Sequence, residues 1–206
     1  MSLDIAQVRD GLAYQGVSLG IVALIASAAL VVANEQTRDA IAAAEARDLA
    51  ASLAQVLPEG TADNDLLKET RAVDNGGTPV TVYVARRAGA VSGAVFSMAG
   101  RGYAGDVMVL MGVDTTGRLF GARVVKHQET PGLGDKIDVA KSNWIRGFDR
   151  KSLGEPPADQ WAVKKDGGVF DQFAGATITP RAVVSAVKAG LTFFAEHRQE
   201  ILGEEK

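Results

Sequence analysis

The N-terminal part of the chain carries a long run without charge. No Asp, Glu, Lys or Arg occurs between Leu12 and Ala33, and most of these positions are apolar or small. A helix rises about 1.5 Å per residue, so this run would span about 33 Å, enough to cross the hydrocarbon core of a bilayer. We therefore expect a single transmembrane helix at residues 12–33, preceded by a tail at residues 1–11.

A secretory signal peptide is the alternative explanation of this run, because Val31-Val32-Ala33 resembles a cleavage site of small residues. The run is long for the apolar region of a signal peptide, which favours a retained anchor. Small residues such as Gly16, Gly20 and Ser27 recur along it, and they let another transmembrane helix approach closely. We expect the anchor to pack against other membrane proteins of a complex.

The next segment, residues 34–57, is rich in alanine and predicts a linker helix that leaves the membrane. Its apolar stripe has roughly helical spacing and comprises Ile41, Leu49, Leu53 and Val56. Pro58-Glu59-Gly60 should end this helix. Residues 60–78 are polar, and we expect them to form a loop.

Beyond residue 78 the pattern changes to that of strands. Apolar and β-branched runs at residues 80–85, 93–96, 107–113 and 119–125 predict a sheet. The last two runs flank the turn sequence Asp114-Thr115-Thr116-Gly117, which is typical of an antiparallel hairpin.

Helices should cover this sheet. Residues 136–148 have helical spacing of apolar positions, and residues 180–202 predict a strong C-terminal helix. Residues 162–170 suggest one more hairpin, turning at Asp166-Gly167-Gly168. The order of elements predicts an α+β fold: one transmembrane helix, then an antiparallel-sheet domain at residues 58–206 with flanking helices.

Composition excludes several classes of function. The 206-residue chain has a net charge of −3, so it lacks the basic surface that a nucleic-acid partner requires. It contains no cysteine, which excludes disulfides and the usual cysteine-ligated iron–sulfur centres. With only His127 and His197, a histidine-rich metal site is not expected.

The segment 171–180 offers candidate chemistry. Gly175 and Ala176 are small, so a bulky group could approach the backbone there. Thr179 before Pro180 suggests an N-cap followed by a proline at the first helical position. A helix N-terminus favours an anion, so a phosphate near Thr177 would be stabilised. The alternative is a loop that simply starts the last helix.

The same segment resembles the flavinylation motif of a known family. Asp171, three intervening residues and then Gly175-Ala176-Thr177 match the motif of the FMN-binding subunits of Rnf and Na⁺-pumping NADH:quinone reductase complexes. In that family the threonine carries FMN through a phosphoester bond, so the resemblance implies one covalent FMN per chain on Thr177. Ala174 departs from the motif, which usually has Ser or Thr there.

A second stretch, residues 127–136, resembles the family's Glu-Thr-Pro-Gly-Leu-Gly loop, which lines the flavin. The implied cofactor-binding residues are Glu129, Thr130, Gly132, Leu133, Gly134 and Lys136, together with Gly175, Ala176 and Thr179 of the motif segment. Leu133 would contact the flat ring, and Lys136 would favour the phosphate or a reduced anionic flavin. A tight turn with a solvated Lys136 is the alternative.

A third and weaker stretch is Gly100–Gly105, which resembles the Gly-Tyr-x-Gly before a strand in such domains and places Tyr103 near the cofactor. It could equally be a strand-entry loop. His127 is a candidate proton donor to the flavin, although a lone histidine is more often structural.

Together these motifs resemble the G subunit of the Rnf complex, a translocase component that is not active alone. The resemblance implies an electron relay in a complex coupling ferredoxin/NAD electron transfer to ion movement. It implies membrane and iron–sulfur partner subunits, a flavin transferase for maturation, and a bacterial inner-membrane location with residues 1–11 cytoplasmic and the FMN domain periplasmic. The C subunit of the Na⁺-translocating NADH:quinone reductase and a flavin-free assembly module remain alternatives. A stand-alone flavin reductase is not favoured, because the sequence shows no nucleotide-binding fingerprint for NAD(P)H.

Overall fold

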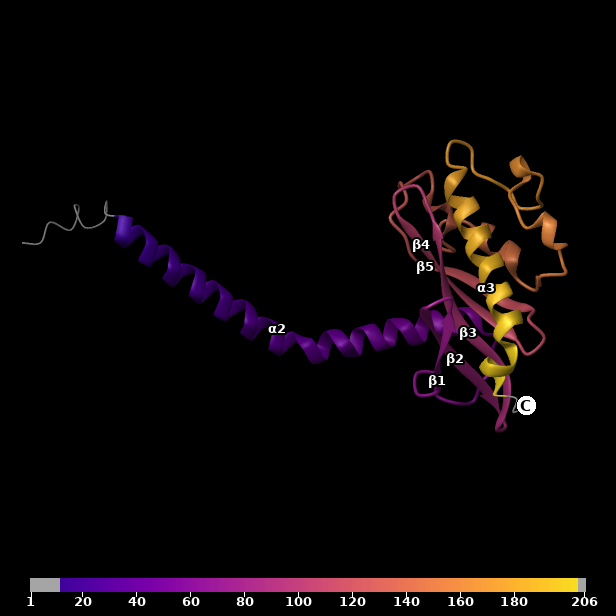
Figure 1. Ribbon diagram of the computed structural model, residues 1–206, viewed down its shortest axis with the longest axis horizontal. Coiled ribbons are helices and arrows are strands. Elements are labelled where there is room, and N and C mark those ends of the chain that lie inside the picture. Colours follow the sequence, from indigo (N-terminus) through magenta and orange to yellow (C-terminus); the bar gives the residue numbers. More distant parts are fainter. Residues whose placement is uncertain (1–11, 204–206) are drawn as a thin grey trace, which may run out of the picture. The chain divides into compact units, whose positions relative to one another are not determined.

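The computed structural model describes residues 12–203. A long helix, a five-stranded sheet, four short 3₁₀ helices and a C-terminal helix follow one another (Figure 1). Their bounds are α2 (Leu12–Val56), β1 (Thr70–Asn75), β2 (Thr78–Arg87), β3 (Ala90–Arg101), β4 (Asp106–Asp114), β5 (Leu119–Lys126), η1 (Asp135–Ile137), η2 (Trp144–Phe148), η3 (Ala158–Gln160), η4 (Lys164–Asp166) and α3 (Ile178–Leu202). The predicted α+β class is confirmed.

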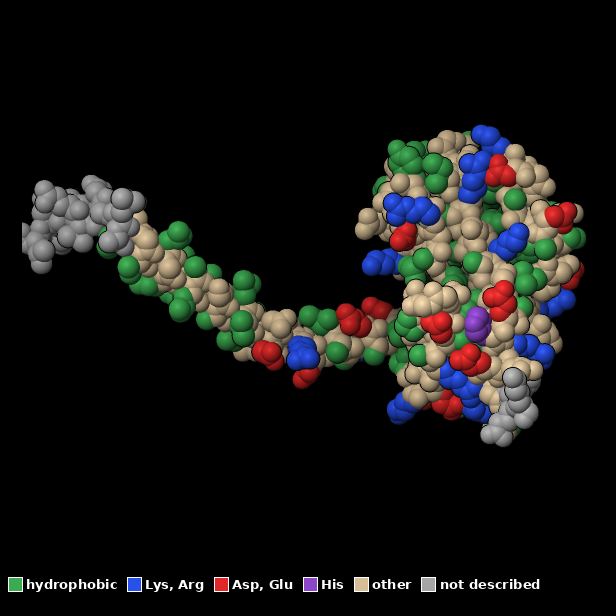
Figure 2. Space-filling view, in the orientation of Figure 1, with side chains coloured by type: hydrophobic (Ala, Val, Ile, Leu, Met, Phe, Trp, Pro, Cys, Tyr) green, Lys and Arg blue, Asp and Glu red, His purple; other side chains and the backbone are tan. Residues whose placement is uncertain are grey.

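Helix α2 runs without a break through the segments predicted as anchor and linker. Among the described residues, α2 is the one helix that is long and apolar enough to cross a membrane. Its most apolar stretch has a mean hydropathy of 2.4 and contains no buried residue. Figure 2 shows that stretch without charged side chains; in the described part of the sequence the first charged residue is Glu35. The chain divides between Arg47 and Asp48 into two compact units, and the last turns of α2 belong to the unit that holds the sheet.

The sheet is an antiparallel meander in which each strand pairs with its neighbour in the chain. Side chains alternate between the two faces of a strand. Phe96 pairs with Met111, and both point to the face covered by α3, whereas Val95 and Leu110 point to the opposite face. The predicted hairpin at residues 107–125 is confirmed as β4 and β5.

Glycines stand at the contact between α3 and the sheet. A Cβ on Gly190 would collide with the end of the Met111 side chain, and one on Gly100 would collide with the carbonyl oxygen of Ala182. Phe96 meets the ring of Phe193 edge to face at 5.4 Å. The apolar face of this helix is buried, as shown by Val183, Val184, Val187, Leu191, Phe194 and Ile201.

The end of α2 covers part of the other face. Leu53 and Val56 are 1% exposed and pack with Val95 and Leu110 in a second, smaller core. Gly112 makes this contact possible, since a Cβ there would collide with the carbonyl oxygen of Val56. Ile41, predicted on the same stripe, is instead exposed and lies in the first unit.

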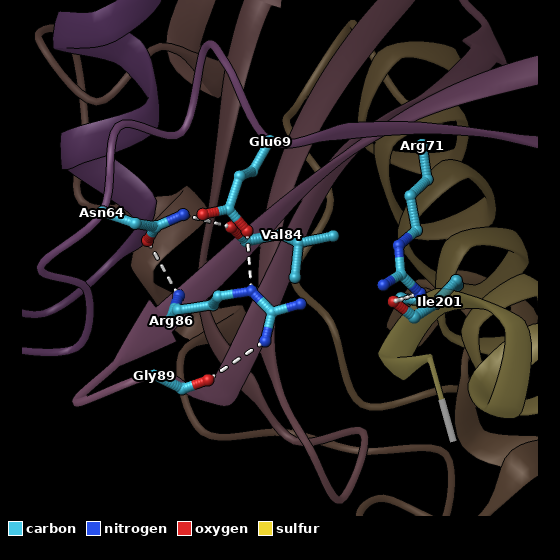
Figure 3. Close-up of polar contacts among 7 residues, drawn as sticks. All are labelled: Asn64, Glu69, Arg71, Val84, Arg86, Gly89 and Ile201. Atoms are coloured by element: carbon cyan, nitrogen blue, oxygen red, sulfur yellow. Dashed lines mark hydrogen bonds and ion pairs between the residues drawn. The ribbon is translucent and has the colours of Figure 1, made fainter. Parts of the chain in front are cut away.

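The polar segment 60–78 was expected to be a loop. This prediction was wrong for Thr70–Asn75, which form strand β1. Its sequence is polar and only Val73 is buried, so an edge strand here leaves little trace in the hydrophobic pattern. Figure 3 shows how polar contacts fix this region: the Asn64 side chain bonds backbone groups of Val84 and Arg86, and the Arg86 guanidinium bonds Glu69. In the same view Arg71 donates to the Ile201 carbonyl at the end of α3.

The predicted helix at residues 136–148 is also wrong. The segment forms only η1 and η2, with buried Ile137 and Ile145. Two polar side chains explain the interruption: Asp138 adopts an extended backbone and its carboxylate meets His127, while Ser142 Oγ accepts the N–H of Trp144. Such local bonds compete with the bonds of a helix.

The predicted hairpin at residues 162–170 is wrong in kind, although the chain does turn at Gly167 with φ of 86°. Val163 and Phe170 form a single parallel bridge around η4 instead of two antiparallel strands. Phe170 packs in an aromatic cluster with Phe148 at 4.5 Å and Trp161 at 5.2 Å. Aromatic packing, and not a strand ladder, therefore holds this segment.

The close contact at Gly112 predicts a specific loss of stability. Gly112→Ala should lower the free energy of unfolding by about 1–3 kcal/mol, because its Cβ would collide with backbone of α2. Gly147→Ala is the matched control, since a Cβ there meets nothing within 4 Å, and it should change stability by less than about 0.5 kcal/mol. Thermal unfolding of both full-length variants in detergent checks this; equal midpoints would contradict the packing at Val56.

Candidate functional site

A pocket of about 320 Å³ lies where three loops meet at the N-terminal end of α3. The loops are the β3–β4 connection, the segment after β5 and the segment before α3. The lining residues are Tyr103, Glu129, Thr130, Leu133, Gly134, Gly175, Ala176, Thr177, Ile178 and Thr179. In Figure 1 this orange end of α3 lies far from the end labelled C.

Glu129 lies at the meeting point of the three loops and is only 4% exposed. Its Oε1 accepts the N–H of Ala104 at 3.0 Å, and its Oε2 accepts the hydroxyl of Thr179. One carboxyl group thereby joins the β3–β4 connection, its own loop and the first turn of α3. Both of its oxygens are satisfied by protein groups, as a buried carboxyl requires.

The bend at residues 130–134 forms one wall of the pocket. The amides of Leu133 and Gly134 both donate to the carbonyl of Thr130, at 3.1 and 3.0 Å, which closes a tight turn. The Asp135 carboxylate accepts the amide of Gly132 at 2.8 Å. These bonds fix the bend, and the Leu133 side chain on it is 47% exposed at the pocket.

The start of α3 differs from the prediction. The helix begins at Ile178 with Thr177 as its N-cap, so Pro180 is its third residue and Thr179 is not the cap. Proline is tolerated throughout a first helical turn, because the N–H groups there have no intrahelical acceptor. Thr179 is instead 1% exposed and donates its hydroxyl to Glu129.

Thr177 has an unusual conformation for an N-cap. Its φ of −70° and ψ of −27° are already helical, whereas capping residues normally adopt extended angles. In this conformation its hydroxyl makes no capping hydrogen bond to the helix. The side chain lines the pocket, beside the unbonded amides that begin every helix. The hydroxyl is thus free for chemistry at a position that favours an anion.

The residues before Thr177 form a tight turn. The amide of Ala176 donates to the carbonyl of Phe173 at 3.1 Å, and Gly175 has φ of 79°. Phe173 anchors the turn by packing against Trp144 at 5.2 Å. A positive φ at the third position of a turn favours glycine strongly, which explains why a glycine stands there.

Ion pairs fix the loop that carries this turn. The Arg181 guanidinium donates to both oxygens of Asp166, at 2.5 and 2.6 Å, and holds the pKa of that carboxyl below its usual value. Lys164 donates to Asp171 at 2.6 Å, and the Asp171 carbonyl accepts the indole N–H of Trp144. These pairs tie η4 and the segment 171–173 to the first turn of α3.

The structure brings together all the site residues predicted from the sequence except Gly132 and Lys136, which do not line the pocket. Lys136 is exposed on η1. Ile178 was missed: it lines the pocket and is 44% exposed. A large apolar residue directly after the Gly-Ala-Thr triplet was the available signal for it.

His127 also lies outside the pocket lining. Its Nδ1 accepts the amide of Glu129 at 3.1 Å, and Nε2 faces Asp138 at 3.1 Å. The ring thus fixes the backbone of Glu129. The geometry favours this structural role over the proton-donor hypothesis.

Comparison with known proteins places this pocket in a family. Residues 102–192 match the model of the FMN-binding domain family, and every pocket residue lies in this range. The domain is therefore of the FMN-binding class.

The full chain is similar to the G subunit of ion-translocating oxidoreductase complexes. It is 51% identical over 188 residues to the protein from Cereibacter sphaeroides, covering 91% of this chain and 86% of that one. It is 47% identical to the protein from Stutzerimonas stutzeri, covering 91% and 82%. The chain belongs to the family of G subunits of ion-translocating oxidoreductase complexes.

The fold has a counterpart among solved structures. The crystal structure of Shewanella oneidensis NqrC matches with a TM-score of 0.50 and 19% identity, over 71% of this chain and 74% of that chain. This likeness concerns the fold of the sheet domain.

The turn at Gly175 predicts a local effect. Gly175→Ala should cost about 1–2 kcal/mol, because a Cβ is strained at this positive φ although it would meet nothing within 4 Å. We expect faster hydrogen exchange at the Ala176 amide. Gly154→Ala, which adds a Cβ in open space without a positive φ, is the control. Unchanged exchange in Gly175→Ala would show that the turn does not depend on glycine.

Proposed function

We propose that this chain is the electron-relay subunit of an ion-translocating oxidoreductase complex and carries one FMN, bound covalently through a phosphoester to Thr177. The observation that carries the proposal is the placement of Thr177: the residue lines the pocket at the start of α3, and its hydroxyl makes no capping bond. Membership of the G-subunit family and the FMN-binding domain support it.

The other pocket threonines are poorer attachment points. Thr179 is 1% exposed and its hydroxyl is engaged by Glu129. Thr130 is exposed but lies in the bend after β5, where its carbonyl closes the turn, and no helix begins there. At Thr177 a phosphate diester would meet the positive end of the α3 dipole and the amides of Ile178 and Thr179.

The remaining walls of the pocket suit a flat aromatic ring. Tyr103, Leu133 and Ile178 line it with exposed fractions of 73%, 47% and 44%, which is high for large apolar side chains. We propose that these side chains contact the ring and keep water from it. FMN, when bound, supplies one- and two-electron transfer, while the chain supplies orientation, electrostatics and a tether.

Attachment requires a separate flavin transferase that uses FAD. The Thr177 oxygen would form a bond to the FMN phosphorus while the pyrophosphate bond of FAD breaks, AMP leaves, and the hydroxyl proton passes to the transferase or to solvent. Asp171, paired with Lys164, and the exposed Ala174 lie on the surface that such an enzyme would meet. Gly132 and Lys136 stay predictions as flavin contacts, since they lie outside the pocket lining.

We further propose that residues 12–33 of α2 cross the bacterial inner membrane and that residues 34–57 link this anchor to the FMN domain at residues 58–206, on the periplasmic side. The length and hydropathy of α2 support the crossing. The tail at residues 1–11, expected in the cytoplasm, lies outside the described residues. Membrane and iron–sulfur subunits of the same complex would donate and accept the electrons.

A flavin-free assembly module is the second candidate function, and Ala174 is the observation that favours it. Its methyl group replaces the hydroxyl usual in the motif. The free Thr177 hydroxyl and the intact bend at residues 130–134 favour the relay. The likeness to NqrC concerns the fold and does not favour the Na⁺-translocating reductase over the G-subunit family.

Thr177→Val should abolish covalent flavin while leaving the fold intact, since valine keeps the shape of threonine and no capping bond is lost. Flavin fluorescence of the denatured chain in a gel measures the covalent flavin. In the assembled complex, electron flow coupled to ion transport should fall to background. Thr192→Val, on the same helix but outside the pocket, should keep both. A full complement of covalent FMN on Thr177→Val would refute the assignment.

Ala174→Ser should speed flavin attachment by restoring the hydroxyl of the motif. Residue 174 is exposed, so the change should leave stability within about 0.5 kcal/mol. The initial rate of flavin incorporation by purified transferase, with FAD, gives the measurement. Ala195→Ser, an exposed alanine on α3, is the control. Equal rates for the wild type and Ala174→Ser would remove Ala174 as an argument for the assembly module.

A further inference from the structure

We propose that Glu129 is a positioning residue: it acts through Thr179 to hold the first turn of α3 where the Thr177 hydroxyl is presented to the pocket. This inference rests on the proposed function, and it assigns Glu129 a role other than that of a direct flavin ligand. Both carboxylate oxygens already bond protein groups, the Ala104 amide and the Thr179 hydroxyl.

The surrounding backbone is built to admit this carboxyl. A Cβ on Gly102 would lie 2.6 Å from Oε1 of Glu129. A Cβ on Gly134 would lie 2.9 Å from both Cβ of Glu129 and Oγ1 of Thr179. Neither glycine has a positive φ, so conformational freedom does not explain them. Gly134 leaves space for the Glu129–Thr179 pair alone, whereas Gly102 leaves space for Glu129 and also for the Gly105 carbonyl oxygen of its own loop, 2.8 Å from such a Cβ.

The partners of Glu129 come from parts of the chain far apart in sequence. Thr179 is 50 residues away and Ala104 is 25 residues away. The backbone of Glu129 is itself held, because its amide donates to His127, whose ring faces Asp138. A fixed backbone and a doubly bonded side chain leave the carboxyl little freedom. Any shift of Glu129 must therefore move the start of α3 or the Tyr103 loop.

The link to the attachment residue is short. Thr179 lies two residues after Thr177, in the same helical turn, so holding its side chain fixes the direction in which the helix starts. The Thr177 N-cap has no capping bond of its own to do this. The same contact buries the Thr179 hydroxyl, which removes a competing nucleophile from the pocket. One hydrogen bond would thus both position Thr177 and favour attachment at Thr177 over Thr179.

The test compares Thr179→Val with Thr179→Ser in the full chain. Valine removes the hydroxyl and leaves Oε2 of Glu129 buried without a partner, whereas serine retains the bond. With purified transferase and FAD, we expect Thr179→Val to lose about tenfold to a hundredfold in the rate of attachment, the order of loss caused by misplacing a reacting group by about 1 Å. Thr179→Ser should restore most of the rate, and Thr192→Val should match the wild type.

Variants of Glu129 separate positioning from a direct effect of its charge. In Glu129→Gln the amide oxygen can accept from Ala104 and the amide nitrogen can donate to Thr179, so attachment and flavin midpoint potential should stay close to wild type. Glu129→Ala should lose both bonds. The double variant Glu129→Ala/Thr179→Val should attach FMN no more slowly than Glu129→Ala by itself, because the two residues act as a unit. An effect of Glu129→Gln as large as that of Glu129→Ala would overturn the proposal.

A flavin-free measurement separates this inference from the proposed function. In the Thr177→Val background, Glu129→Ala should speed hydrogen exchange at the amides of Ala104 and Arg181, which donate to Glu129 and to the Thr177 carbonyl, while β3 and β4 stay protected. Unchanged exchange would overturn the positioning role. If the exchange responds but wild-type chain accepts no FMN, the positioning role stands and the flavin assignment fails.

Discussion

Helix α3 packs tightly against the sheet at two glycines: Gly100 on β3 faces the backbone of Ala182, and Gly190 on α3 leaves room for the Met111 side chain. This contact fixes the height and direction of the helix. Its N-terminus consequently lies beside the loops that leave β3 and β5. A buried carboxyl, Glu129, joins these three segments. The pocket is thus a product of helix–sheet packing, completed by one polar contact.

The chemistry of the site follows from this placement. A helix start offers free amides and a partial positive charge, and the tight turn at Gly175 brings Thr177 to it. Apolar side chains from three loops complete the walls. An anion can therefore be bound at one end of the pocket and a flat apolar ring at the other, which is the combination that FMN requires.

Sequence patterns predicted the parts of this arrangement that repeat along the chain. The strands β2 to β5, the long α2 and the buried face of α3 follow from periodic apolar positions. The edge strand β1 was not predicted, because only Val73 of its residues is buried and the hydrophobic pattern there is weak. The segment 136–148 was misjudged, because side-chain bonds of Asp138 and Ser142 outweigh its helical spacing.

The site was largely predictable because its residues lie in short motifs. The role of Thr179 was not, since Thr-Pro favours an N-cap locally and its contact with Glu129 spans 50 residues. Ile178 has no polar chemistry, and only its place directly after the Gly-Ala-Thr triplet marks it in the sequence. Contacts between distant segments decide such roles, and they leave no periodic signal in a single sequence.

The most direct test of the central claim is mass spectrometry of the chain purified from its native membrane. A flavin relay predicts that the intact mass exceeds the sequence mass by one FMN less water and that the peptide holding Thr177 carries the addition. An unmodified Thr177 peptide from cells with an active flavin transferase would contradict the account.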